Sequence, residues 1–252
     1  MSTVFISDLH LDASQTKLLI ALEALLQRLL NQPPQALYML GDIFDAWVGD
    51  DDPTPWFEPI KIQLQKLNAT NCSIYFLHGN RDFLVGETFC RQMCAELVQE
   101  PLVINLYGTP TALLHGDALC TQDTHYQTFK QKVRSPSWQR AFLEKPLPER
   151  RAIAAHLRDQ SKTQTSNKPE AIMDVSPDAV TELFNRPHAI RSTGVRRIIH
   201  GHTHRPNLHE YPNQKQRWVL GDWRTQPQLS ISYLVATEAG LTLHSGERQW
   251  AG

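Results

Sequence analysis

Cysteines are few in this chain of 252 residues, and none of the four stands in a CxxC pair. The opening residues, MSTVF, lead directly into an expected strand, so we expect no secretory signal. A disulfide framework is therefore not expected, and the thiols should be reduced in the cytoplasm. We expect all four to be buried structural residues: Cys72, Cys90, Cys94 and Cys120.

Net charge is also nearly absent, because 25 Lys and Arg residues oppose 26 Asp and Glu residues. This balance does not indicate a nucleic-acid-binding protein. No apolar stretch reaches the roughly 18 to 20 residues that cross a bilayer, so we expect a protein that is soluble or lies on a membrane without crossing it. The length suits one large domain, or one domain with an insertion.

Apolar runs that end abruptly in polar clusters recur along the chain. The runs VFI, ALYML, SIYFL, ALL and RRII precede SDLH, GDIFD, HGNRD, HGD and HGHTH. Each run is typical of a buried strand whose carboxyl end carries side chains into a loop, where ligands bind in open α/β sheets. Helical periodicity over 15–30 and 55–67 predicts the connections between the first three strands. The sequence therefore predicts an α/β fold.

The segment from about 122 to 185 breaks this alternation. It carries amphipathic helical patterns such as WQRAFL and ERRAIAAHLRDQ, so we expect a helical insertion, or lid, within one domain over 1–252. Ten Lys and Arg residues oppose four Asp and Glu residues over 122–168. That excess indicates an anionic partner, with a solvated helical face as the alternative.

Carboxylate and imidazole side chains follow the expected strands at regular spacings. Asp8 and His10 are two residues apart, as are His202 and His204, so each pair faces one side of an extended segment. Such pairs suit divalent metals. The ordered set of polar residues predicts a metal site: Asp8, His10, Asp42, Asp45, Asn80, Asp82, His115, His202 and His204.

Asp42 is the expected bridge between two metal ions. Ions about 3.5 to 4 Å apart can share one carboxylate and hold a hydroxide between them. Two carboxylates oppose two divalent ions, while Asn80 and the imidazoles are neutral. About two positive charges therefore remain uncompensated, so a phosphate is the expected substrate group. We expect Asp45 and Asp82 to orient ligands rather than to bind metal.

We expect three further polar features to have structural roles. His78 and His200 lie inside expected strands, so we expect them to pack behind the metal ligands. The acidic run GDDDP at 49–53 resembles a metal site, but acids before a proline are typical of a capped, solvated turn, which we expect here.

The motifs DLH, GDIFD, GNRD, HGD and GHTH resemble those of the calcineurin-like metallophosphoesterase superfamily, whose fold is two packed sheets flanked by helices. Within it, the chain resembles the UDP-2,3-diacylglucosamine hydrolases, the pyrophosphatases of lipid A biosynthesis in Gram-negative bacteria, over nearly its whole length. The stretches that carry this narrower resemblance are DLHL, GDIFDAWVGDDDP, HGNRDFL, HGDALCTQD, SKTQTSNKPEAIMDV and HGHTHRP.

The resemblance implies two divalent ions, with Mn²⁺ as the usual metal of the family. One ion would be held by Asp8, His10, Asp42 and His204, and the other by Asp42, Asn80, His115 and His202. The implied catalytic residues are Asp42, Asn80, Arg81, His115 and His202. The implied substrate contacts are Asn80, Arg81, Asp123, Ser161, Thr165, Lys168 and His202. Thr165 stands where the family commonly has Asn, and it keeps a hydroxyl but loses the reach of the amide.

Arg81 stands where related phosphatases have a His that acts as general acid. A pyrophosphate bond releases a phosphate monoester that needs little protonation, so the acid is dispensable and a bidentate positive charge helps instead. The resemblance implies attack of metal-bound hydroxide on the phosphorus attached to uridine, giving UMP and 2,3-diacylglucosamine 1-phosphate. The alternative for Arg81 is a surface ion pair with Asp82.

The lipid substrate implies a peripheral protein on the cytoplasmic face of the inner membrane. The insertion would supply an apolar groove for acyl chains and basic residues for anionic lipid. We expect a monomer. We expect no nucleic-acid partner, because no continuous basic path with stacking aromatics is present. A hydrolase of the same scaffold acting on a lipid-free substrate is the main alternative. A non-catalytic interaction module is disfavoured, because all seven ligand positions are intact.

Overall fold

The computed structural model describes residues 1–166, 172–188, 194–246 and 248–251, and of residues 161–166 it describes the backbone alone. The strands of this described part form two sheets. Their bounds are β1 (Ser2–Ile6), β2 (Ala36–Leu40), β3 (Ser73–Leu77), β4 (Ala95–Val98), β5 (Leu102–Leu106), β6 (Thr109–Leu113), β7 (Arg197–His200), β8 (Asn207–Tyr211), β9 (Lys215–Val219), β10 (Ser232–Thr237), β11 (Gly240–Ser245) and β12 (Arg248–Ala251).

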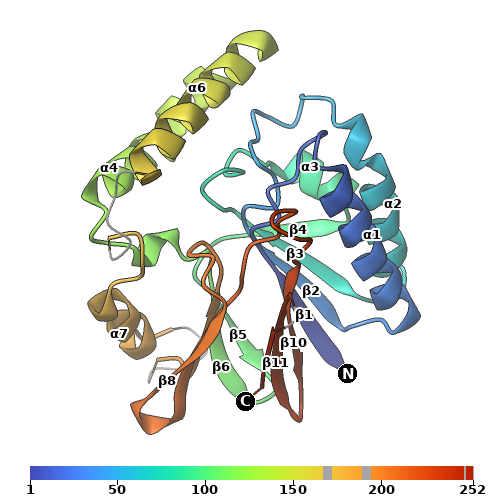
Figure 1. The fold of residues 1–252 in the computed structure, drawn as a ribbon, viewed down its shortest axis with the longest axis vertical. Helices are drawn as coiled ribbons and strands as arrows, with labels where there is room; N and C mark the ends of the chain where they lie inside the picture. The colour runs from blue at the N-terminus through green and yellow to red at the C-terminus, as the bar shows by residue number, and fades with distance from the viewer. Residues whose placement is uncertain (167–171, 189–193, 247, 252) are drawn as a thin grey trace.

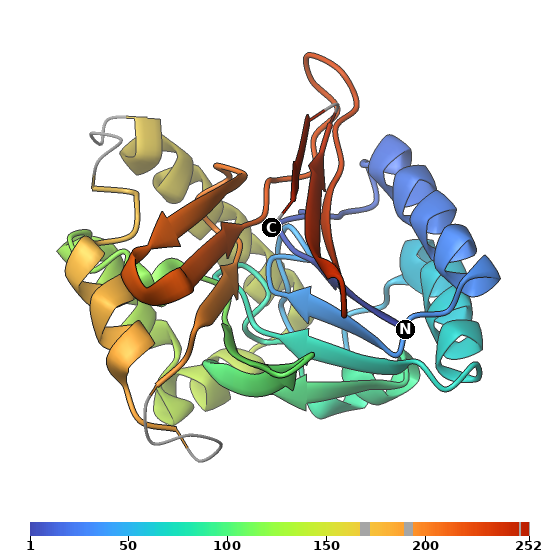
Figure 2. The ribbon, with the colours of Figure 1, turned by 90° about the horizontal axis from the view of Figure 1, so that it is seen from below.

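Both sheets are mixed, and their inner faces pack against each other across a shared apolar layer (Figures 1 and 2). The first has the order β12-β11-β10-β1-β2-β3-β4, in which β1 to β4 run parallel and β10 to β12 antiparallel. The second has the order β5-β6-β7-β9-β8, in which β6, β7 and β9 run parallel. The parallel strands direct their carboxyl ends to loops that hold the candidate site.

Helices cover the outer faces of the sheets and extend beyond them. Their bounds are α1 (Thr16–Asn31), α2 (Glu58–Asn68), α3 (Glu87–Gln92), α4 (Thr124–Val133), α5 (Pro136–Leu143), α6 (Leu147–Ser166) and α7 (Pro177–Asn185), with short 3-10 turns at Pro55–Phe57, Asp117–Leu119 and Pro212–Gln214. Helices α1 and α2 lie on the outer side of the first sheet, and α7 lies on the outer side of the second (Figure 2). Among the described helices, none is both long and apolar enough to span a membrane.

Alternating side chains on the central strands build two apolar layers. Val4 and Ile6 of β1 belong to the layer shared with α1 and α2, whereas Phe5 points into the layer between the sheets. Trp218 of β9 fills the second layer and is fully buried. Helix α1 meets the first layer with apolar residues spaced three and four apart, among them Leu22. Sheet register is therefore fixed by burial on both faces.

The insertion helices α4, α5 and α6 stand between β6 and β7 in the sequence and above the sheets in space (Figure 1). Pro136 and Pro177 begin α5 and α7 behind capping serines, as the helix geometry favours. Helix α6 is held to the loop after β2 by ion pairs of Arg150 with Asp51 and of Arg151 with Asp52.

The fold class, two sheets flanked by helices, is confirmed. The predicted helices over 15–30 and 55–67 correspond to α1 and to α2 with its preceding 3-10 turn. One expectation about the cysteines is wrong: Cys72, Cys90 and Cys120 are buried, but Cys94 is exposed. Cys94 stands in the tight turn between α3 and β4 with φ of 53°, so its side chain leaves the core.

Candidate active site

Loops from both sheets meet at the candidate site. Within the first sheet, the backbone N–H of Asp8 donates to Gly41 O at 3.1 Å, and that of His10 donates to Asp42 O at 3.0 Å. Within the second, the N–H of Gly201 donates to His115 O at 2.8 Å. Within each sheet, these bonds join loops that are far apart in the sequence.

Most of the predicted ligands have an unusual backbone conformation. The φ angles of five of them lie between 51° and 66°, in the left-handed region that side chains other than glycine rarely adopt: Asp8, His10, Asp42, His202 and His204. Such conformations cost of order 1 to 3 kcal/mol each and persist at functional sites, where surrounding bonds hold them. Gly79 permits the close approach of two of these loops, because a Cβ there would lie 2.2 Å from Asp42 N.

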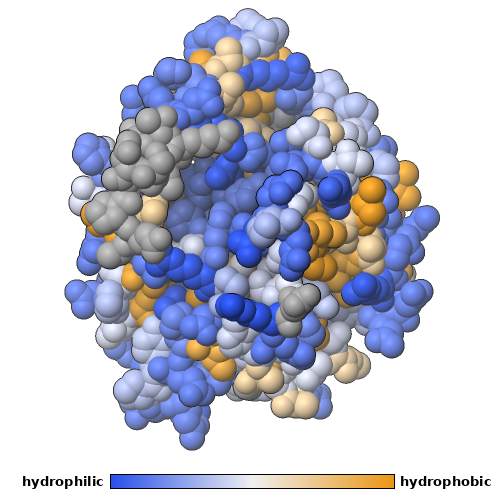
Figure 3. Space-filling view, viewed as in Figure 1, coloured by the Kyte–Doolittle hydropathy of each residue, from blue (hydrophilic) through white to orange (hydrophobic). Residues whose placement is uncertain are grey.

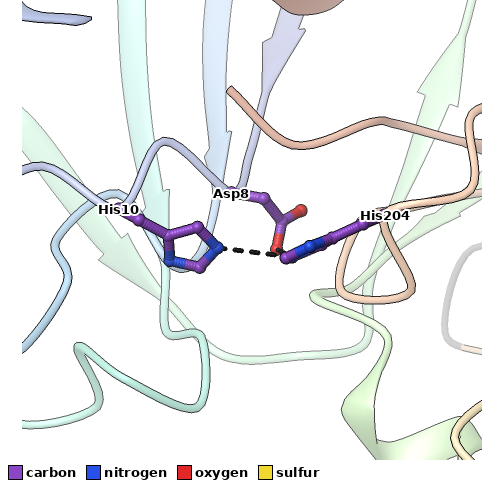
Figure 4. Close-up of side chains that lie close together, drawn as sticks. All are labelled: Asp8, His10 and His204. Carbon is purple, nitrogen blue, oxygen red and sulfur yellow. Dashed lines mark hydrogen bonds and ion pairs between the residues drawn. The ribbon is translucent and has the colours of Figure 1, made fainter. Parts of the chain in front are cut away.

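Asp8, His10 and His204 form one group that could hold a metal ion. His10 Nε2 lies 3.3 Å from His204 Nε2, which in turn lies 3.3 Å from Asp8 Oδ1 (Figure 4). Figure 4 shows the two rings facing each other beside the Asp8 carboxylate. One carboxylate oxygen and two imidazole nitrogens are ligands that suit a divalent ion.

A second group of possible ligands consists of Asp8, Asp42 and His115. His115 Nε2 lies 3.7 Å from Asp42 Oδ2 and 2.9 Å from Asn80 Oδ1. His202 Nδ1 also lies 2.9 Å from Asn80 Oδ1, so this amide oxygen faces two imidazoles. The two groups share Asp8, and Asp42 lies close to both, since His10 Nδ1 is 3.9 Å from Asp42 Oδ2.

Buried polar atoms at the site fit a pair of cations. Asp8 Oδ1 and His10 Nδ1 are hidden from solvent and make no hydrogen bond of good geometry within the described residues. Burying such groups without a hydrogen bond is costly, and metal coordination would satisfy them. The residues present therefore fit two divalent ions.

The pKa shifts describe a site that attracts positive charge. Burial raises the pKa of Asp42 to about 7, and Asp82 and Asp8 act in the same direction. Burial also acts to lower the pKa of His115, but the carboxylates of Asp42 and Asp8 outweigh it and raise that pKa to about 9. Burial and the neighbouring His115 lower the pKa of His202 to about 4.

Asp82 and Asp45 have separate tasks in the structure. Asp82 is fully buried and accepts backbone N–H bonds at 2.8 Å from both Gly79 and Ile43, so it joins the loops after β2 and β3. Asp45 forms ion pairs with Arg81 at 3.2 Å and with Arg158 at 2.6 Å. Neither belongs to the two groups of possible ligands.

His78, His200 and the acidic run also lie outside the ligand groups. His78 Nε2 contacts Val85 O at 2.6 Å, and His200 Nε2 lies 3.1 Å from Arg217 Nη1. The run at 49–53 is a turn, as predicted. Its acids are not simply solvated, because Asp50 accepts N–H bonds at the start of α3, and Asp51 and Asp52 form ion pairs with α6.

Arg81 faces the ligands rather than Asp82. Its Nε lies 3.5 Å from Asp42 Oδ2, its backbone N–H donates to Asp42 Oδ1 at 2.8 Å, and its side chain is 32% exposed. The alternative of a surface pair with Asp82 is therefore wrong, because the N–H groups of the loops occupy that carboxylate. Arg81 can reach both the ligand cluster and the cavity above it.

The remaining predicted substrate contacts belong to the segment 122–185. Asp123 caps α4 by accepting the N–H of Tyr126 at 3.0 Å. Ser161 and Thr165 belong to α6, where the structure describes only their backbone. Lys168 lies outside the described residues.

A cavity of about 1130 Å³ opens above the ligand cluster. Asp42, Asn80, His202 and His204 line one part of it, and apolar residues of the insertion line another. Figure 3 shows a mostly hydrophilic face in this view, with apolar residues near the top and on the right-hand side. The cavity thus joins polar, metal-binding chemistry to an apolar wall.

Comparisons with known proteins identify the family of the chain. A model of the calcineurin-like phosphoesterase family matches residues 1–206. The chain belongs to this family. Over 248 residues, the phosphoesterase is 48% identical to UDP-2,3-diacylglucosamine hydrolase of Cellvibrio japonicus, with 97% of this chain and 99% of the relative covered. It is 43% identical to the enzyme of that name from Marinobacter nauticus, with 88% and 90% covered. The predicted family is confirmed.

Sequence reasoning missed a set of residues behind this phosphoesterase site. Asp117, Tyr126 and Lys130 form a partly buried cluster beside His115 and His202. Only Asp117 had a sequence signal, because it follows His115 in the HGD motif. Tyr126 and Lys130 stand in a helical pattern that does not distinguish them from neighbouring surface residues.

Proposed function

We propose that this phosphoesterase hydrolyses the pyrophosphate bond of UDP-2,3-diacylglucosamine and releases UMP and 2,3-diacylglucosamine 1-phosphate. The observation that carries the proposal is the cavity that joins the ligand cluster to the apolar wall. A substrate with a diphosphate at one end and acyl chains at the other matches both parts. Relatives that are 42 to 48% identical in sequence to this chain are named for this activity.

The polar part of the cavity would bind the diphosphate. Two divalent ions, Mn²⁺ in our proposal, would supply the nucleophile and offset the charge of the phosphates when bound. Asp8, His10, Asp42 and His204 would hold one ion, and Asp42, Asn80, His115 and His202 the other. Asp42 is the residue that we propose as their bridge.

Arg81 would hold the phosphates through its guanidinium group, which already faces Asp42 at the wall of the cavity. The leaving group is a phosphate monoester, so the chain has no need of a protonated His at this position. Attack at the phosphorus attached to uridine follows if the sugar phosphate is that leaving group. Asp123, Ser161, Thr165 and Lys168 complete the proposed substrate contacts.

The apolar wall would bind the acyl chains. Its side chains come from the loop after β3 and from the helices of the segment 122–185, and they include Leu84, Phe129, Trp138, Phe142 and Leu157. Phe129 is 38% exposed, which leaves it able to contact a ligand. Burial of apolar surface stabilises such a contact by about 25 cal/mol per Å².

Access to a substrate in the bilayer requires a protein at the membrane surface. We propose that the phosphoesterase binds the cytoplasmic face of the inner membrane through the insertion. Lys132 and Arg140 support this proposal, because neither has an ion pair among the described residues, and each cation near anionic lipid contributes about 1 kcal/mol.

The test is turnover of UDP-2,3-diacylglucosamine in mixed micelles with Mn²⁺ in ¹⁸O-labelled water, followed by mass spectrometry of both products. Label in UMP is expected. Label in the sugar phosphate would keep the substrate but contradict the proposed point of attack. Rapid cleavage of a small phosphodiester without turnover of the lipid would refute the substrate. The variant Asp42→Asn, assayed in parallel, controls for a contaminating hydrolase.

A further inference from the structure

Helix α4 and its C-cap residue, Arg134, touch the three loops that carry Asn80, His115 and His202. Lys130 Nζ lies 2.9 Å from Asp117 Oδ2, two residues after His115. Arg134 Nη2 donates to Gly79 O at 2.8 Å, directly before Asn80. The ring of Tyr126 lies 6.2 Å from that of His202 at an interplanar angle of 29°. One insertion helix therefore contacts the surroundings of three predicted ligands.

Lys130 stands at the centre of these contacts because it joins two acids. Its Nζ lies 3.4 Å from Glu100 Oε1, while Glu100 Oε2 accepts the backbone N–H of His115 at 2.8 Å. Asp117 accepts the hydroxyl of Tyr126 with the same Oδ2 that faces Lys130. One cation thus connects the main chain of His115 with the ring that stacks on His202.

The burial of this network makes the charge of Lys130 important. The side chains of Lys130 and Glu100 are 16% and 15% exposed, and that of Asp117 is fully buried. Removing one partner of a buried ion pair leaves an uncompensated charge and forces neighbouring groups to move. The basic residues Lys130 and Arg134 of the insertion therefore point inward, to the site, rather than to an external anion.

We propose that Lys130 is a positioning residue for the metal subsite of Asn80, His115 and His202. It fixes the main chain of His115 through Glu100 and the ring of Tyr126 through Asp117. Both His115 Nε2 and His202 Nδ1 lie 2.9 Å from Asn80 Oδ1, so a displaced ring would leave this amide oxygen. Metal sites tolerate displacements of only about 0.5 Å. The inference rests on the two-metal centre of the proposed function, but not on the substrate.

The variant Lys130→Met keeps a long side chain and removes the charge. Titration with Mn²⁺ alone, followed by electron paramagnetic resonance of the free and bound ion, counts the ions and measures their affinities. We expect the wild type to bind two ions with a spin-coupled signal. In the variant, the ion of Asp8, His10 and His204 should bind as before, while the second should bind about 10- to 100-fold more weakly and the coupled signal should fade.

The matched control is Lys145→Met, because Lys145 pairs with Glu149 on the exposed side of the same insertion. It should bind both ions as the wild type does. Unfolding curves recorded in EDTA verify that each variant folds without metal. Wild-type affinity for both ions in folded Lys130→Met would overturn the inference, as would an equal loss of both.

A second variant keeps the inference testable if Lys130→Met does not fold. Tyr126→Phe removes the hydroxyl bond to Asp117 and leaves Lys130 paired. About tenfold weaker binding of the second ion would support the network, whereas unchanged binding would refute it. The proposed function fails independently: a wild type that binds two ions but does not turn over the lipid would contradict the substrate and leave this inference intact.

Discussion

The Nε2 atoms of His10 and His204 lie 3.3 Å apart, although the two residues are 194 positions apart in the sequence. A neutral imidazole offers one donor and one acceptor nitrogen, so two facing Nε2 atoms can share at most one proton. A divalent cation beside Asp8 would accept the lone pairs of both. The backbone bonds that fix the two loops therefore preorganise this pair for a metal ion.

Metal ions should stabilise the fold as well as activate it. An ion that binds only the folded state, present at 100 times its dissociation constant, adds about 2.7 kcal/mol to the free energy of unfolding. We expect thermal midpoints to rise with Mn²⁺ after dialysis against EDTA, and hydrolysis to return in parallel. The variant Asp8→Asn should lose most of the rise. An equal rise in the wild type and the variant would contradict the ligand assignment.

Arg81 should act through the bidentate geometry of its guanidinium group as well as through its positive charge. A hydrogen bond to a charged group contributes about 1.5 to 3 kcal/mol, so Arg81→Ala should lower kcat/KM for the pyrophosphate substrate about 10- to 100-fold. Arg81→Lys should recover part of this loss, because it restores a point charge without the bidentate fork. Steady-state kinetics with Arg91→Ala, a change on the exposed face of α3, provides the control. Full activity of Arg81→Ala would refute the role.

The strand ends of the site were predictable because burial and chemistry coincide there. A branched apolar run must be buried, and a polar cluster directly after it must lie at the sheet edge, so the loops after β1, β2, β3, β6 and β7 could be placed without coordinates. Asp42 and His115 are examples: each follows such a run and lies in a group of possible ligands.

The tertiary partners of charged residues could not be predicted in this way. Asp51 and Arg150 are 99 positions apart, and nothing in the sequence indicates that they pair. An acid that binds the insertion therefore cannot be distinguished in the sequence from a solvated turn residue. The same holds for Lys130, whose inward direction depends on how α4 docks. The excess of basic residues over 122–168 was visible, but most of their described partners are acids and backbone carbonyls of this chain.

Asp82 should stabilise the frame of the site without binding metal. Its carboxylate accepts N–H bonds from four backbone groups, those of Gly79, Asp42, Ile43 and Phe44. An Asn side chain keeps one acceptor oxygen, but its NH₂ group would point at some of these N–H donors. Asp82→Asn should lower the free energy of unfolding by about 3 kcal/mol, which corresponds to a fall of about 6 to 12 °C in Tm. Calorimetry of the metal-free protein measures this fall, and Glu238→Gln in the exposed turn before β11 should show none.

Phe129 should contribute to the recognition of acyl chains alone. It lines the cavity and is 38% exposed, so replacing it by Ser removes apolar contact without opening the core. Partial loss of a buried phenyl contact costs about 1 to 2 kcal/mol, so KM for the diacylated substrate should rise about 5- to 30-fold.

The comparison of two substrates and two variants makes this prediction specific. Turnover of a UDP-sugar without acyl chains should be the same for Phe129→Ser and the wild type, because the polar part of the cavity is unchanged. The matched control is Ile62→Ser on α2, where an apolar side chain is 44% exposed outside the cavity. Equal KM values of Phe129→Ser and Ile62→Ser for the lipid would show that the acyl chains bind elsewhere, and a parallel loss on both substrates would show that Phe129 supports the site rather than the lipid.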